Sequence, residues 1–310
     1  MPQQNTGNAL LNSAFNLWDF GTTSSIVTLP EHGYLANRWK VTRHGNGMGT
    51  VSKSSTPAGA YDAPKWMRNT AALSMNVTQV DRAAGTVTIA QTVENAFLWQ
   101  RGIVTLLIVA AGPAGATFKV AYDSSVVGEI TTQGKTSAGV DIFTTHEIRF
   151  MQGDSAAKDI SVAIFTSPSQ TGEYKISHAQ LKFGGDPGDL AILPRTDAEE
   201  RTLCQRYGYV AGGGSVGQGD GNQIIFNIAH PARMRKAPTF IPATTGNITI
   251  VDAATGATSV ASANRLAWRV VSTTETNAVI AATGWQGQSR GQGMKVATGG
   301  STVGALVADY

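Results

Sequence analysis

The chain has 310 residues, of which 15% are charged, and its formal net charge is +3 at pH 7. This length suffices for two domains with separate cores, while the charged fraction lies well below the ~25% usual for soluble proteins. Its Lys and Arg residues are scattered and the longest basic cluster is Arg233–Lys236, which argues against nucleic acid as a partner.

Cysteine content and leader signals limit the class of protein further. Cys204 is the single cysteine of the chain, so an intrachain disulfide is excluded. Residues 1–7 are polar and are expected to form a flexible arm and no secretory leader. The longest apolar run, Ile103–Ala111, is about half of the ~20 residues that a membrane-spanning helix needs. We therefore expect assembly in a cytoplasm and no membrane insertion.

Short β-type runs bounded by Gly, Pro, Asp and Ser fill the chain from Leu10 to about Phe183. The run Ile103–Ala110 is almost continuously apolar, which predicts a central, buried strand. About eight or nine antiparallel strands of this kind predict a β-sandwich of jelly-roll type. The other runs are Arg38–Arg43, Leu73–Thr78, Gly85–Val93, Thr117–Tyr122, Thr144–Phe150, Ile160–Phe165 and Tyr174–Leu181.

The segment Leu193–Tyr207 predicts a short helix between two β-rich halves. Thr196 followed by Glu199 is a capping box, and acidic residues in the first turn suit the helix dipole. Leu203, Cys204 and Tyr207 share one face, where Cys204 is expected to be a small buried hydrophobe and no nucleophile.

The second half begins with the glycine-rich stretch Ala211–Gly221. A phosphate-binding loop is one interpretation, but the flanking strand, helix and Gly-Lys-Ser/Thr ending are missing, so a flexible hairpin or a threading segment is favoured. Alternation then resumes and predicts a smaller antiparallel β-domain. Its strands are expected at Gln223–Ile228, Thr239–Pro242, Asn247–Val251, Leu266–Val271, Ala278–Ala281 and Val303–Tyr310.

These patterns predict an all-β protein with an N-terminal jelly-roll β-sandwich, a short linking helix and a smaller C-terminal antiparallel β-domain. The expected division is a flexible arm at residues 1–7, the sandwich at 8–185, the linker and helix at 186–210, and the C-terminal domain at 211–310.

Several short motifs, in this order, resemble tailed-bacteriophage tail-fibre and virion-associated proteins. The central one combines Arg195 with Glu199, Glu200, Leu203, Cys204, Gln205, Arg206 and Tyr207 at the helix junction. The others are Asn8–Asn12 with Phe15 and Trp18, Tyr34–Trp39, Gln91–Glu94, Ala179–Leu181, and Phe226–Pro238 with Met234 and Arg235. Two departures, Asn37 in place of Asp and Lys182–Asp186 in place of a Glu-Gly turn, weaken any acidic metal or sugar contact there.

The resemblance implies a non-enzymatic structural virion protein with a carbohydrate-binding-module-like first domain: a tail-fibre, tail-tip or head-fibre component that adheres to a host surface or glycan. It further implies other virion proteins as partners, a homo-oligomer that is a trimer in many such families, and a place in the virion. A capsid decoration protein and a free-standing glycan-binding module or depolymerase remain as alternatives.

The residues themselves show no catalytic constellation. The five histidines (His32, His44, His146, His178 and His230) are spread singly, with no metal-ligand spacing; His146 and His178, within strand-like runs, are expected to be structural. Glycoside cleavage needs two neighbouring carboxylates, and no acidic residue is paired with another by sequence alone. We predict no enzymatic activity, no cofactor and no metal.

Stacking of a sugar on an exposed aromatic ring is the interaction that the sequence offers instead. Trp18 and Trp39 lie in strand-like motifs and are expected in the core. Trp66, in a loop-like stretch, is the first candidate for ligand contact; Tyr61, Trp99 and, near the C-terminus, Trp285 are the others.

Overall fold

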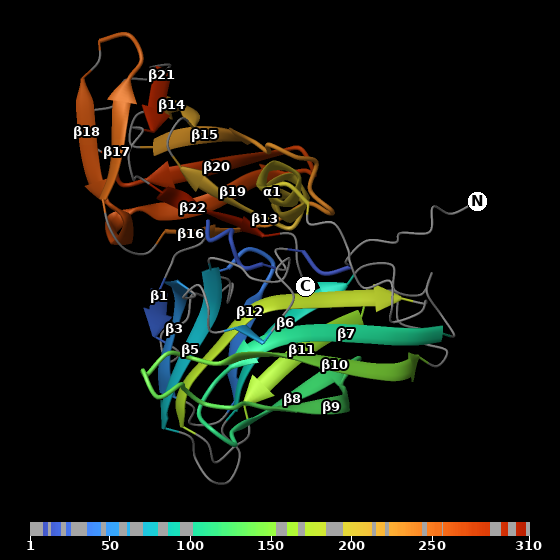
Figure 1. Cartoon of the computed structure of the whole chain (residues 1–310). Helices are drawn as coiled ribbons and strands as arrows, with labels where there is room; N and C mark the ends of the chain where they lie inside the picture. The colour runs from blue at the N-terminus through green and yellow to red at the C-terminus, as the bar shows by residue number, and fades with distance from the viewer. Residues whose placement is uncertain are drawn as a thin grey trace. The chain divides into compact units, whose positions relative to one another are not determined.

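The computed structural model describes residues 9–11, 14–19, 23–25, 36–44, 48–55, 61–62, 71–79, 86–93, 102–152, 160–166, 171–183, 195–212, 215–220, 223–243, 247–255, 257–285, 293–296 and 302–307. The chain divides into two compact units, Met1–Glu200 and Arg201–Tyr310. The described elements are strands, one short α-helix and one 3-10 turn (Figure 1). The finer expected division into arm, sandwich and linker stays a prediction.

The first unit is a sandwich of two sheets (Figure 1). The larger sheet has the order β1-β3-β5-β12-β7-β10-β4, and its strands are β1 (Thr23–Ser25), β3 (Met48–Ser55), β4 (Tyr61–Asp62), β5 (Ala71–Gln79), β7 (Gly102–Ala111), β10 (Phe143–Gln152) and β12 (Gly172–Phe183). The smaller sheet has the order β2-β6-β11-β8-β9, with β2 (Lys40–His44), β6 (Thr86–Val93), β8 (Thr117–Tyr122), β9 (Ser125–Thr131) and β11 (Ile160–Thr166). Strand pairs are antiparallel, apart from the parallel contact of β4 with β10.

Burial follows the hydrophobic pattern of each strand. β6 alternates between half-buried and buried residues, because only one face of its sheet meets the core. β7 is buried from Val104 to Ala111 and lies between β12 and β10, so the prediction of a central strand is confirmed. The sandwich confirms the predicted jelly-roll fold class.

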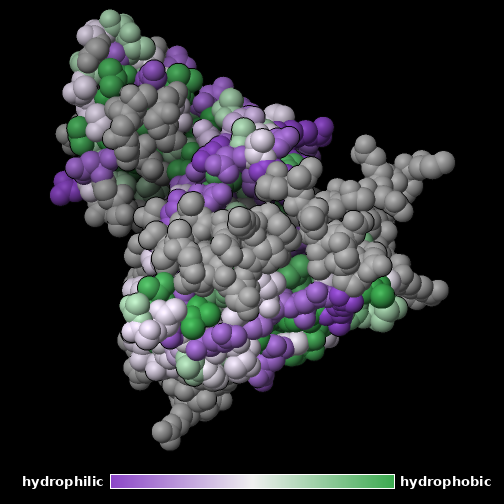
Figure 2. All heavy atoms as spheres, viewed as in Figure 1, coloured by the Kyte–Doolittle hydropathy of each residue, from purple (hydrophilic) through white to green (hydrophobic). Residues whose placement is uncertain are grey.

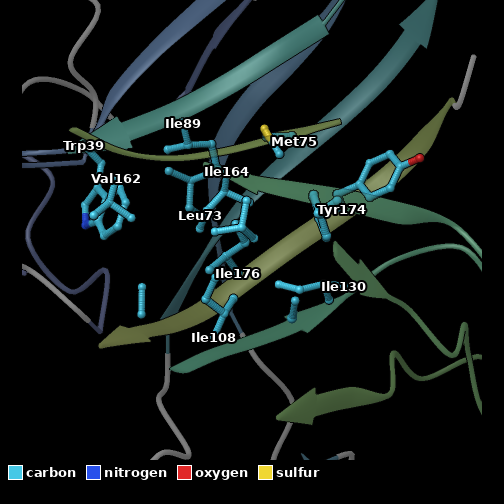
Figure 3. Packing of buried hydrophobic residues seen from close by; sticks show 14 of the residues in the cluster. Trp39, Leu73, Met75, Ile89, Ile108, Ile130, Val162, Ile164, Tyr174 and Ile176 are labelled. Carbon is cyan, nitrogen blue, oxygen red and sulfur yellow. The ribbon is translucent and has the colours of Figure 1, made fainter. Parts of the chain in front are cut away.

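Between the two sheets lies one apolar core (Figure 3). Val162 and Ile164 of β11, Met75 of β5 and Ile108 of β7 meet there and are fully buried. Tyr174 lies edge-on to Phe118, with ring centroids 5.0 Å apart.

The described residues of the N-terminal motifs line the same core. Trp39 is fully buried beside Phe15, with ring centroids 5.0 Å apart, and Trp18 donates its indole N–H to the Phe15 carbonyl at 2.5 Å. Asn37 and Asp19 exchange two hydrogen bonds of 2.8 Å. The expectation that Trp18 and Trp39 are core residues is therefore confirmed.

α1 (Asp197–Gln205) forms where the capping box predicts it. The Glu199 N–H donates to Thr196 Oγ1 at 3.3 Å, and the Thr196 N–H donates to Glu199 Oε2 at 2.9 Å. These reciprocal bonds satisfy backbone donors at the helix start. Cys204 and Tyr207 are buried, as their helical spacing predicts.

The second unit contains a three-stranded and a seven-stranded sheet. The small sheet has the order β13-β22-β16, with β13 (Gly208–Gly212), β16 (Thr239–Pro242) and β22 (Thr302–Val307). The large sheet has the order β18-β17-β21-β14-β15-β20-β19. Its strands are β14 (Val216–Asp220), β15 (Gln223–Ala229), β17 (Asn247–Asp252), β18 (Thr258–Ser262), β19 (Ala267–Thr273), β20 (Asn277–Thr283) and β21 (Gly293–Val296), with the 3-10 turn η4 (Ala263–Arg265) after β18. The smaller antiparallel domain is thus confirmed.

Two glycine-rich stretches of this unit contribute to its sheet and its core. The glycine-rich stretch includes strand β14, which pairs with β15 and β21. Gly217 is required there because a Cβ would lie only 2.9 Å from Ile224 and 3.0 Å from Phe226, so close packing and not flexibility explains this glycine. Trp285, at the start of a second glycine-rich stretch, is 3% exposed and packs within the core.

Candidate functional site

The outer face of the seven-stranded sheet in the first unit is the candidate site. Successive side chains of a strand point to opposite faces, so the side chains of β7 that alternate with the core residues Val104, Leu106 and Ile108 point outward. On this outer face Leu107, Val109 and Ala111 of β7 form a second small cluster with Phe143, the first residue of β10. A buried apolar strip therefore runs along the middle of the face.

Polar side chains of the neighbouring strands flank this strip in register. On β12, His178, Gln180 and Lys182 pair with Val109, Leu107 and Thr105. On β10, Thr145, Glu147 and Arg149 pair with the same three residues of β7. The register therefore places polar groups on both sides of a central apolar strand.

A group of ionised side chains occupies one end of the face. Lys175 Nζ lies 2.5 Å from Asp141 Oδ2 and 3.2 Å from Glu173 Oε1, and Lys135 Nζ lies 3.5 Å from Asp141 Oδ1. Ser74 of β5 donates to Glu173 Oε1 at 3.0 Å. Burial alone would lower the pKa of Lys175, but hydrogen bonds and charges of Asp141 and Glu173 outweigh it, and the pKa is raised. Lys175 is therefore a fixed ammonium at neutral pH.

The opposite end of the face is apolar and exposed. Ile103 of β7 and Met151 of β10 are register partners, with 47% and 70% of their surface exposed. The ion pair of Glu147 with Arg149 lies next to them on β10. Figure 2 shows this arrangement as hydrophobic atoms at the right-hand end of β7 and β10, beside a band of hydrophilic atoms. Ile103 and Met151 thus form the exposed apolar pair of this face.

His178 and Gln180 form the buried middle of the face, with 8% and 2% of their surfaces exposed. Burial lowers the pKa of His178 to about 4, although its hydrogen bond with Gln180 works in the opposite direction. The imidazole is therefore neutral at pH 7 and can act as both donor and acceptor. These two side chains support the expected structural role of His178.

Because Leu107, Val109, His178 and Gln180 are buried, binding by hydrogen bonds and apolar contact is open to the exposed part of this face alone, around Ile103, Met151 and the pair Glu147–Arg149. Its carboxylates lie in ion pairs with Lys175 and Arg149. Among the described residues, no group of three or more His, Cys, Asp or Glu side chains could hold a metal ion. No helix in the described part of the chain is long and apolar enough to cross a membrane.

Of the aromatic residues predicted to contact a ligand, the structure describes the side chain of Trp285 alone. Trp66 and Trp99 lie outside the described residues, and Tyr61 belongs to the short strand β4, of which only the backbone is described. Trp285 lies in the core of the second unit, where no ring face is open to a ligand. The outer-face residues were missed because their alternation was interpreted only as a strand pattern.

The residues of the predicted helix junction make structural contacts. Arg195 Nη1 lies 3.2 Å from Glu200 Oε2 and 3.4 Å from the Leu10 carbonyl. The Arg206 carbonyl accepts a bond from the Arg235 N–H at 2.9 Å, and Tyr207 is 7% exposed. These contacts explain why the junction combines charged and apolar residues.

Comparisons with known proteins concern the fold alone. No family model matches the chain, and no curated protein does. The carbohydrate-binding module TmCBM61, solved in complex with β-1,4-galactotriose, is 13% identical; the match covers 56% of this chain and 97% of that chain, with a TM-score of 0.36. A Stig cyclase from Fischerella sp. TAU is 12% identical, with coverages of 55% and 93% and a TM-score of 0.35.

The enzymatically active domain of tailspike protein 4 from bacteriophage CBA120 also matches. It is 12% identical over 56% of this chain and 21% of that chain, with a TM-score of 0.33. The match therefore spans about a fifth of the tailspike domain.

Proposed function

We propose that the chain is a non-enzymatic structural protein of a tailed-phage virion, a tail-fibre, tail-tip or head-fibre component, and that its first unit adheres to a host-surface glycan. The ordered sequence motifs support the virion assignment. The observation that supports adhesion is the outer face of the seven-stranded sheet, where exposed Ile103 and Met151 lie beside ion-paired polar side chains. Sugars present both C–H and hydroxyl groups, so such a mixed face complements them.

Adhesion without cleavage is supported by the state of the carboxylates. Asp141 and Glu173 both contact the Lys175 ammonium, at 2.5 and 3.2 Å. A glycosidase uses one of two neighbouring carboxyl groups as its general acid, whereas Asp141 and Glu173 are both engaged by the same ammonium group. A depolymerase would need a differently arranged acid pair.

The partners follow from this proposal. The chain would assemble with other virion proteins as a homo-oligomer, a trimer in the families that it resembles. Several weak sites on one particle would bind together, because tethering raises the effective concentration of each further site. A capsid decoration protein would differ only in where it attaches, and electron microscopy of intact particles with a label on this chain distinguishes head from tail.

A glycan array with the full chain tests adhesion. Ile103→Ser combined with Met151→Ser removes the exposed apolar pair, and we expect about tenfold weaker glycan binding, equivalent to ~1.4 kcal/mol. Val126→Ser is the control, because the exposed fraction of Val126 (59%) lies between those of Ile103 and Met151, but Val126 belongs to β9 of the other sheet. Equal loss in both variants, or no binding by the wild type, would contradict the proposal. Release of sugar from host capsule would favour the depolymerase alternative.

A further inference from the structure

Eight strands form the ends of the four described sheets. An end strand presents backbone donors and acceptors that can pair with another chain, and proteins limit this with short strands, charges, proline or bulges. Seven of the eight carry such a device. Two of them are very short, since β1 has 3 residues and β4 has 2. Charged residues lie in β2 (Lys40 and Arg43), β9 (Glu129) and β19 (Arg269), and β16 contains Pro242. The pairings of β9, β13 and β19 with their neighbours each contain a register shift.

β18 is the exception among these described strands. Its sequence, Thr258–Ser262, contains no charge, proline or glycine, and it pairs with β17 without a register shift. Figure 1 shows β18 as the outermost strand of its sheet. At its centre Val260 is 59% exposed, among the largest exposures of an apolar side chain in the second unit.

One face of β18 packs on the core, and Val260 lies on the other face. Ser259 and Ala261 pair with Ile250 and Ile248 of β17, which are core residues. Val260 pairs with Thr249 and so lies on the opposite, outer face of the sheet. Core packing therefore does not explain an apolar residue at position 260.

We propose that β18 pairs with β18 of a second copy of this chain, in antiparallel orientation about a two-fold axis at Val260. In that register Val260 faces its own copy, Ser259 faces Ala261, and Thr258 faces Ser262, so no like charges meet. A self-complementary strand suits the isologous contact of a two-fold dimer, and the two sheets would become continuous through main-chain bonds. The contact concerns the second unit and is independent of glycan binding.

The association should be concentration-dependent. One pair of five-residue strands buries less than the ~1,200 Å² of a standard specific interface. In a particle that already holds several copies together, a weak contact of this kind gains from high effective concentration.

Sedimentation equilibrium of the full chain over a concentration series tests the pairing. The wild-type mass should rise with concentration, and Val260→Lys should reach only half of the wild-type mass, because two lysines would oppose each other at the axis. Masses are counted in multiples of the 32.4 kDa chain, so that an oligomer joined through other surfaces would double in mass when β18 pairs. Val270→Lys is the control, since Val270 is 45% exposed on β19 at the other end of the same sheet, and it should associate like wild type.

A cysteine variant gives a second readout that does not depend on charge. Cross-strand Cβ atoms lie ~4.5–5.5 Å apart, near the ~3.5–4.5 Å of a disulfide. Val260→Cys should form a disulfide-linked dimer on mild oxidation, whereas Val270→Cys should not; Cys204 is buried in both. A wild type that stays at 32.4 kDa throughout, undiminished association of Val260→Lys, or equal cross-linking of the two cysteine variants overturns the proposal.

Discussion

The side-chain amide of Gln91 clamps the backbone of Leu11, which lies 80 residues earlier in the chain. Its Oε1 accepts the Leu11 N–H at 2.6 Å and its Nε2 donates to the Leu11 carbonyl at 2.8 Å. Gln91 is 2% exposed, so both bonds are shielded from water. The amide thereby attaches the N-terminal segment to β6.

Gln91→Leu should lower the free energy of unfolding by about 1–3 kcal/mol, because it leaves a buried donor and a buried acceptor without partners. Thr92→Ala is the control, since Thr92 is the next residue of β6 on its half-buried face, and its effect should stay within about 0.5 kcal/mol. Denaturant titration measures both. Equal losses of stability in Gln91→Leu and Thr92→Ala would mean that the two hydrogen bonds of Gln91 make no specific contribution.

Asp141→Asn should destabilise the first unit through Lys175. The ammonium would lose its ionised partner at 2.5 Å, and hydrogen bonds to charged groups contribute about 1.5–3 kcal/mol. Lys135→Met, which alters only the longer and more exposed contact of Asp141, should have an effect near zero. If Asp141→Asn and Lys135→Met unfold at the same denaturant concentration, the ion pair of Asp141 with Lys175 makes no specific contribution to stability.

The same ion pair predicts a response to alkaline pH. The folded pKa of Lys175 lies above its ordinary value of 10.5. Its contribution to stability is therefore complete below pH 10.5 and is lost as the pH rises through the higher folded pKa. Unfolding free energies should fall more steeply in that window for wild type than for Lys175→Met. Parallel curves for the two proteins would contradict the assignment.

His178 predicts a loss of stability on the acid side. Burial lowers its pKa from 6.5 to about 4, so the unfolded chain binds a proton more readily than the folded one. The contribution is complete above pH 6.5 and is lost progressively down to about pH 4, with a total of about 3 kcal/mol. NMR titration of the ring, identified by its absence in His178→Gln, should show protonation only near pH 4. A midpoint near 6.5 would rule out this contribution.

The strands with the clearest alternation were the ones that the sequence predicted best. β8 and β16 were predicted with their observed bounds, and β7 was identified as central because its apolar run is almost unbroken. The strands β3 and β9 escaped prediction because Ser, Thr, Gly and Lys fill β3, while β9 has exposed or half-buried residues along most of its length. Their pairing depends on neighbouring strands and not on local pattern.

The sequence motifs on which the family resemblance rests contribute to the fold and do not form the candidate binding face. Asn37, Trp39, Gln91 and Leu181 are all buried and make core or backbone contacts, so these motifs specify the fold. The candidate binding face instead depends on register between β10, β7 and β12. Residues such as Ile103 and Met151 are far apart in sequence, and no local signal indicates that they are neighbours.

Two glycines of the first unit provide a matched test of backbone strain. Gly49 follows a register shift in the β3–β5 pair and has a φ of +144°, and a Cβ at this position would lie 1.9 Å from the Asn76 carbonyl oxygen. Gly102, at the start of β7, has no atom within 4 Å of its Cβ position and lacks a positive φ. Gly49→Ala should therefore cost at least about 1–3 kcal/mol of unfolding free energy, the range for a residue in a sparsely populated conformation.

Gly102→Ala should be neutral or slightly stabilising, by about 0.4–1 kcal/mol, because alanine restricts the unfolded chain. Since both changes add one methyl group to an end of a strand in the same sheet, the difference between them isolates local geometry from side-chain chemistry. Thermal unfolding of the two variants side by side measures that difference. A stable Gly49→Ala protein would mean that β3 and β5 pair without the register shift, and the outer face that they share with β12 would then have a different arrangement.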